Sequence, residues 1–212
     1  MKRRFFNAES GLWKPLGVLG DLLMLSLLWG VCCLPVLTIG AATTALYDTV
    51  VHVLRRQDDV LFARFFGTLR RELATGALST VLWIAVISAE YLLYRFLMTS
   101  LPEDSRSVVL IAYLVLVPFF TFCVLGWVFP ILSRFTFRAM ALNVTAVRLA
   151  FGNILRSAVL GIIAEANFFL ALAVGPALMV TPALAALLAS YVIEPVFEKY
   201  EHPEGEREAE KP

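Results

Sequence analysis

Polar side chains that could carry chemistry stand inside apolar runs of this sequence, at Asp21, Asp48, Glu90, Glu165 and Asn167. An ionisable group within a membrane is costly, and it commonly marks an ion or proton path or a functional contact. A helix rises about 1.5 Å per residue, so Asp21, Asp48 and Glu165 would share one depth, roughly 10 Å from the cytoplasmic end of their spans. Together with Asn167, these acids predict a polar cluster that serves either an ion- or proton-linked cavity or a groove for a partner helix.

Two kinds of basic residue could balance the acids. His52 lies four residues after Asp48, so their side chains are neighbours on a helix, and such a pair favours a charged imidazolium beside a carboxylate. In a structural interpretation, arginines at the membrane surface reach inward along their flexible stems and pair with the acids, the candidates being Arg134, Arg138 and Arg156. The sequence leaves both interpretations open and favours the structural one.

No constellation of catalytic residues accompanies these acids. The sequence has no nucleophile paired with a base, no phosphate-binding loop, no HExxH and no paired CxxC motif. Its three cysteines, Cys32, Cys33 and Cys123, lie in apolar runs without metal-ligand spacing. A thiol in that setting behaves as a small hydrophobic group. We therefore expect no enzymatic activity, no cofactor and no metal site.

The composition indicates where the protein resides. Of its 212 residues, 59% are hydrophobic and 17% are charged, whereas a soluble domain carries about 25% charged residues. Apolar runs of about 18 residues or more are the length of a membrane helix. The first run is longer than the roughly 7–15 residues of a signal-peptide core. The sequence predicts an integral membrane protein whose first partner is the lipid bilayer, with no nucleic acid among its partners.

The apolar runs predict up to six membrane helices, at residues 16–34, 36–54, 76–98, 108–132, 157–175 and 177–193. Gly175 and Pro176 predict a tight turn between the last two. The run 36–54 is marginal because it contains several threonines, Asp48 and His52. Without it the chain would have five spans.

The basic residues decide between five and six spans, because lysine and arginine near short loops favour the cytoplasmic side. Five spans would leave six of the 18 lysines and arginines outside. Six spans leave only Arg95 and Arg106 outside, and 18 less 2 gives 16 inside. We therefore predict an all-α bundle of six membrane helices in one membrane domain, residues 1–197, with both termini cytoplasmic. The polar residues 198–212 predict a disordered cytoplasmic tail.

Two connections between spans are basic and amphipathic, and both are expected to lie along the cytoplasmic leaflet. The first connection places apolar side chains on one helical face, at Phe62, Phe65, Phe66, Leu69 and Leu73. Arg64, Arg70 and Arg71 lie among or opposite them. The second contains Arg134 and Arg138. The connections share the similar strings FFGTLRREL and AFGNILRSA, which indicate either an internal repeat of the kind some transporters show or two unrelated interfacial helices.

Small residues predict one packing surface. Gly40, Ala41 and Thr44 lie at spacings of three and four on the second span. Small side chains let membrane helices approach closely. This face is expected to contact other helices rather than lipid.

The stretch LLWGVCCLPVLTIGAATTALYDTV, followed by FARFFGTLRRELATGALSTVLW, resembles the YesL family of bacterial membrane proteins, whose function is unknown. The matching motif residues are Trp29, Cys32, Leu34, Pro35, Thr38, Ile39, Gly40, Thr44, Ala45, Leu46 and Tyr47. In the second segment Phe65, Phe66, Arg70 and Arg71 match, whereas LRREL replaces the family's lysine- and asparagine-rich string.

This resemblance implies a functional setting. Members are often encoded beside ABC transporters that depend on sugar-binding proteins, and beside polysaccharide-degrading enzymes. The resemblance therefore implies, by association alone, a non-catalytic accessory or regulatory partner of a carbohydrate ABC transporter in the bacterial plasma membrane. The residues leave two alternatives: a small secondary carrier or channel that uses Asp21, Asp48 and Glu165, and a membrane-shaping or assembly protein that binds no ligand.

Overall fold

The computed structural model describes residues 13–55, 60–100, 102–175 and 179–201, and these residues are helical with short connections. The all-α class is thus confirmed for the described chain. The α-helices are α1 (Trp13–Cys32), α2 (Ile39–Thr49), α3 (Leu61–Arg71), α4 (Leu73–Ser100), α5 (Glu103–Arg134), α6 (Ala139–Gly152), α7 (Ile154–Ala173) and α8 (Thr181–Glu201). A 3-10 turn, η1 (Val36–Thr38), precedes α2, and a π-helical segment, η2 (Val50–Arg55), continues it.

Four stretches of helix are long and apolar enough to cross a membrane: Val36–Arg55, Leu73–Ser100, Ser107–Arg134 and Ile154–Ala173. They overlap the second to fifth predicted spans, so the marginal run 36–54 has the length and composition of a span. The first and sixth predicted spans correspond to α1 and α8. The described apolar part of α1, Gly17–Cys32, is shorter, and a total of six spans stays a prediction.

The last two predicted spans are separate helices, because α7 ends at Ala173 and α8 begins at Thr181. Pro176, in the predicted turn between them, lies outside the described residues. Helix α8 continues to Glu201, so residues 198–201, which the sequence assigned to the tail, are helical. Residues 202–212 lie outside the described part of the chain.

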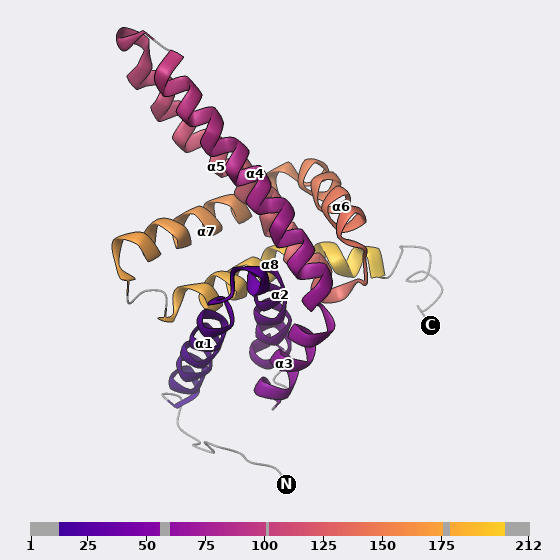
Figure 1. The fold of residues 1–212 in the computed structure, drawn as a ribbon. Helices are drawn as coiled ribbons and strands as arrows, with labels where there is room; N and C mark the ends of the chain where they lie inside the picture. The colour runs from indigo at the N-terminus through magenta and orange to yellow at the C-terminus, as the bar shows by residue number, and fades with distance from the viewer. Residues whose placement is uncertain (1–12, 56–59, 101, 176–178, 202–212) are drawn as a thin grey trace.

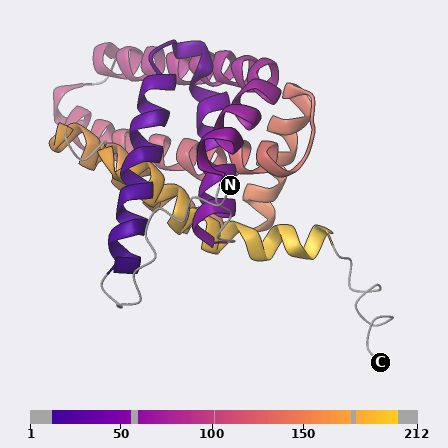
Figure 2. The same ribbon diagram turned by 90° about the horizontal axis from the view of Figure 1, so that it is seen from below.

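The helices form three antiparallel hairpins that cross one another, rather than a bundle with one common direction (Figure 1). These hairpins are α1 with α2, α4 with α5, and α7 with α8. The far half of the α4–α5 hairpin extends beyond the other helices, and the view from below shows α1 and α2 running across it (Figure 2). The stretch Val36–Arg55, which contains α2, is central. Of its most apolar 18 residues 61% are buried, against 11–22% in the other three long stretches.

Close packing of α2 on α4 depends on Gly40. A Cβ at this position would lie 2.5 Å from the carbonyl oxygen of Gly76 and 2.6 Å from Oγ1 of Thr80. The Gly40 amide donates to the same Oγ1 over 2.9 Å. Ala41 and Thr44 are fully buried as well. The prediction that Gly40, Ala41 and Thr44 face other helices is therefore confirmed.

The structure supports the repeat interpretation. The shift that aligns Phe66 with Phe151 (151 less 66, or 85) also aligns Gly76 with Gly161 (161 less 76, or 85). A Cβ on Gly161 would lie 2.6 Å from Sγ of Cys123 on α5. Each unit consists of a helical stretch long enough to cross a membrane, a short helix and a second long helix, with a glycine where the two long stretches meet. The units are Val36–Arg55 with α3 and α4, and α5 with α6 and α7.

Candidate functional site

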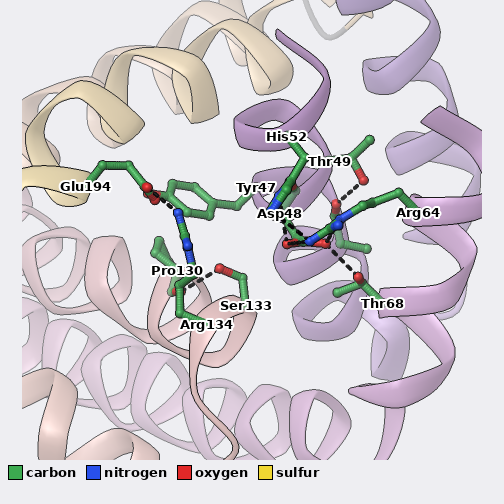
Figure 3. A network of polar contacts seen from close by, with 11 residues as sticks. Tyr47, Asp48, Thr49, His52, Arg64, Thr68, Pro130, Ser133, Arg134 and Glu194 are labelled. Carbon is green, nitrogen blue, oxygen red and sulfur yellow. Dashed lines mark hydrogen bonds and ion pairs between the residues drawn. The ribbon is translucent and has the colours of Figure 1, made fainter. Parts of the chain in front are cut away.

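Asp48 is the centre of a buried polar network (Figure 3). Its side chain is 2% exposed. Arg64 on α3 donates from Nε to Oδ2 over 2.8 Å and from Nη2 to Oδ1 over 3.0 Å. Thr68, one turn further along α3, donates to Oδ2 over 2.7 Å. A two-pronged guanidinium–carboxylate contact is among the strongest polar interactions, so this network fastens α3 to α2.

His52 completes the network as a hydrogen-bond acceptor. Its Nε2 lies 2.9 Å from Nη2 of Arg64, and its Nδ1 lies 2.9 Å from the carbonyl oxygen of Asp48. Arginine can only donate, so in this contact Nε2 accepts, and Nδ1 faces the Asp48 carbonyl oxygen. The predicted proximity of His52 to Asp48 is confirmed, with Nδ1 and Oδ1 3.3 Å apart. The positive charge that contacts both carboxylate oxygens of Asp48 comes from Arg64.

The network lies where α2 changes helix type. His52 belongs to the π-helical segment η2, and such segments are frequent at functional sites. Arg55, at the end of η2, donates from Nη1 to the carbonyl oxygen of Ser190 over 3.0 Å. Its guanidinium also lies 4.8 Å from the centre of the Tyr191 ring. This segment is therefore bound to α3 through His52 and to α8 through Arg55.

A second buried acid, Glu194 on α8, joins three helices. Tyr47 of α2 donates to its Oε1 over 3.2 Å, and Arg134 of α5 donates to Oε2. The Glu194 and Arg134 side chains are 4% and 12% exposed. The sequence placed Arg134 at the membrane interface or in a pair with one of the three cluster acids. It does form an ion pair, but with an acid outside that set.

Sequence reasoning missed Glu194 because it lies beyond the apolar run ending at Ile193. A signal was present nevertheless. Glu194 is followed by Pro195 and then by Val196 and Phe197, both of which are buried. An acid flanked on both sides by core-type residues on one helix was a candidate for burial.

The other predicted polar residues do not join Asp48. Asp21 on α1 and Glu165 on α7 are half-buried, and in the described chain neither forms a hydrogen bond or an ion pair with it. Asn167 is half-buried, and its Oδ1 has no hydrogen-bond partner among the described residues. Glu90 accepts a hydrogen bond from Thr121 across the α4–α5 hairpin. The structure thus disperses the three acids that the sequence placed at one depth.

The arginines predicted at the interface divide into two groups. Arg64 and Arg134 turn inward to carboxylates. Arg70, Arg71 and Arg138 are exposed, and Arg71 pairs with the neighbouring Glu72 over 2.6 Å. Of the apolar α3 residues expected on one face, only Phe65 is fully buried, whereas Phe62 and Phe66 remain exposed.

The motif residues around the α1–α2 turn hold its shape. Thr38 donates to the carbonyl oxygens of Cys32 and Pro35. Trp29 donates from Nε1 to Oγ1 of Thr43 over 3.2 Å, which ties α1 to α2. Pro35 itself is exposed. The motif therefore connects the turn to the helix that carries Tyr47 and Asp48.

Residues 22–94 match a family model described as a protein of unknown function, DUF624. The matched segment runs from α1 into α4, so it contains the whole Asp48 network and Tyr47. Arg134 and Glu194 lie outside it. No curated protein and no solved structure matches the chain.

Proposed function

We propose that this chain is a non-catalytic, multi-pass protein of the bacterial plasma membrane that acts as an accessory or regulatory partner of a carbohydrate ABC transport system. The observation that supports a non-catalytic, non-conducting role is that an arginine occupies the buried carboxylate of Asp48. Its two carboxylate oxygens accept three hydrogen bonds from Arg64 and Thr68. A carboxylate engaged in this way stabilises helix packing and offers little to a passing ion.

Glu194 supports the same conclusion from the other side of α2. It is buried and accepts hydrogen bonds from Tyr47 and Arg134. Removing one member of a buried ion pair leaves an uncompensated charge, which costs about 3–5 kcal/mol. Both acids therefore suit a fixed scaffold that presents its surfaces to a partner.

The choice of partner rests on the resemblance of residues 29–47 to the YesL family, whose members are often encoded beside sugar-importing ABC transporters. The orientation rests on the basic residues. With six spans and cytoplasmic termini, the Asp48 and Glu194 networks lie near the cytoplasmic ends of α2, α5 and α8. Helix α6 then lies on the cytoplasmic side, whereas α3 runs back along α2 from Asp48 toward Gly40, where the start of α4 packs.

Affinity purification from native membranes tests the partner. The tagged chain should enrich an ABC permease subunit over an unrelated multi-pass protein carrying the same tag. A deletion strain should also grow poorly on at least one of a panel of oligosaccharides, and the intact gene should restore growth. Equal recovery with both tagged proteins, together with unimpaired growth on the whole panel, would contradict the transporter role.

The alternative is a small secondary carrier or channel that uses Asp21, Asp48 and Glu165. One observation favours it: Asp21 and Glu165 are half-buried on apolar helices, yet neither forms an ion pair with a described residue. Purified protein in liposomes should then move sugars, protons or cations faster than empty liposomes do. Flux that disappears in Glu165→Gln would replace the accessory role with the carrier.

A further inference from the structure

Helix α6 has two apolar faces, and among the described residues only one of them is buried against other helices. Its inner face is buried, with Leu142 and Ala146 in the core beside α5. A second face remains exposed at spacings of four, three and four residues, at Met140, Val144, Val147 and Phe151. Phe151 is 70% exposed. Figures 1 and 2 show α6 at the outer edge of the molecule.

This exposed stripe continues into the next helix. Ile154 and Leu155, at the start of α7, are 70% and 81% exposed. Helix α6 has 14 residues and is therefore about 21 Å long, too short for a hydrocarbon core of about 30 Å. A short helix with an apolar outer face suits a position along the membrane surface, with that face toward the acyl chains.

Three exposed arginines lie in the same segment as the stripe: Arg138, Arg148 and Arg156. Arg148 lies four residues after Val144 and three before Phe151, so it is a neighbour of both on the helix surface. The sequence has no aspartate or glutamate between residues 105 and 164. Positive charge along this segment is therefore not balanced by acids of the segment itself, in contrast to α3, where Arg71 pairs with Glu72.

We propose that α6 and the first turn of α7 form a binding site for anionic phospholipid. Guanidinium groups of Arg138, Arg148 and Arg156 bind headgroup phosphate, for which the planar guanidinium is well shaped. The acyl chains lie along Val144, Phe151 and Leu155. A lipid fits better than a free phosphate because only a lipid also covers the apolar stripe. The proposal needs the membrane placement of the chain but not its transporter partner.

Native mass spectrometry of the purified full chain in detergent tests the site. Phosphatidylglycerol and phosphatidylcholine are added separately at equal concentration, and the lipid retained per protein is counted. The parent should retain phosphatidylglycerol preferentially. Each arginine near a membrane surface is worth about fivefold in affinity for anionic lipid, so R138Q/R148Q/R156Q should weaken retention on the order of 100-fold. Arg95→Gln, an exposed arginine toward the far end of α4, is the matched control and should retain lipid as the parent does.

Other outcomes would overturn the proposal. These are equal retention of the two lipids by the parent, undiminished retention by the triple variant, or an equal loss in Arg95→Gln. Inorganic phosphate at the lipid concentration should not displace phosphatidylglycerol, and displacement would indicate a site for soluble anions instead. If the triple variant loses its helical circular dichroism, Arg148→Gln and Phe151→Ser are measured singly, and each should still reduce retention of phosphatidylglycerol. Because the purified chain is tested alone, failure here leaves the transporter role untouched.

Discussion

Arg64 and Asp48 form a two-pronged ion pair whose partners differ in exposure: the Asp48 side chain is 2% exposed and that of Arg64 is 36% exposed. The arginine thus reaches from the surface helix α3 into the interior and holds α3 against the central helix α2. Thr68 strengthens the contact from the same face of α3. The Asp48 carboxylate therefore holds the polar side of the α2–α3 contact, beside the buried ring of Phe65.

Replacing that carboxylate should loosen α3. In Asp48→Asn the side-chain volume is kept while the charge that balances Arg64 is lost. We expect a loss of about 1–3 kcal/mol in the free energy of unfolding, as for a buried polar group that loses its partner. Thermal unfolding in detergent measures the change. A melting temperature within a degree or so of the parent would show that water and other groups satisfy Arg64 equally well.

The partner arginine gives a matched comparison on the same helix. Arg64→Gln should destabilise the protein, whereas Arg70→Gln, at an exposed position of α3, should stay within about 0.5 kcal/mol of the parent. Because Asp48 and Arg64 touch, the double variant D48N/R64Q should lose less than the sum of the two single losses. Strict additivity would mean that the contact does not contribute to stability.

The sequence predicts the helices well because apolar length and periodicity are local properties. The boundaries of α4 and α5 lie near the predicted ones, and the buried face of Gly40 follows from small residues at helical spacing. The pairing of Arg64 with Asp48 does not follow in this way. It depends on how α3 rotates about its axis after the 56–59 connection, and the phenylalanine pattern of α3 suggested a different buried face.

For the same reason, the depth of an acid along its own helix did not predict which side chains it would contact. Asp21, Asp48 and Glu165 were placed at one depth on the assumption of parallel helices, but the three hairpins cross, so equal depth does not bring side chains together. The burial of Glu194 likewise depends on α8 passing against α2 and α5. Such tertiary crossings are set by packing between distant segments, which no local pattern encodes.

Gly40 should tolerate no side chain. In Gly40→Ala the new Cβ would meet the backbone oxygen of Gly76, which cannot move aside as a flexible side chain would. Overpacking of this kind costs about 1–3 kcal/mol. Yield and melting temperature in detergent should both fall. Gly30→Ala is the control, because a Cβ there has no neighbouring atom within 4 Å, and its melting temperature should stay level or rise.

Loss of the Glu194 charge should lower the free energy of unfolding more than loss of the Tyr47 hydroxyl that donates to it. Glu194→Gln removes the carboxylate charge that faces the Arg134 guanidinium, 12% exposed, and breaking a buried pair costs about 3–5 kcal/mol. Tyr47→Phe removes one hydrogen bond and should cost about 1 kcal/mol. Chemical unfolding in detergent gives both values. Arg134→Gln should resemble Glu194→Gln, and Arg138→Gln should resemble the parent; the reverse order would contradict the structural role of Glu194.

The six-span orientation makes a prediction for each side of the membrane. Alkaline phosphatase, which folds only outside the cytoplasm, should be active when it is fused after Pro35 or after Ser105. A fluorescent protein should fluoresce in the cytoplasm when it is fused after Asp59 or after Asn143. The physical reason is that basic residues near short loops resist transfer across the membrane, and only Arg95 and Arg106 lie on the outer side in this orientation. Phosphatase activity from a fusion near the N-terminus would overturn it and leave five spans, with α2 and η2 inserted without crossing.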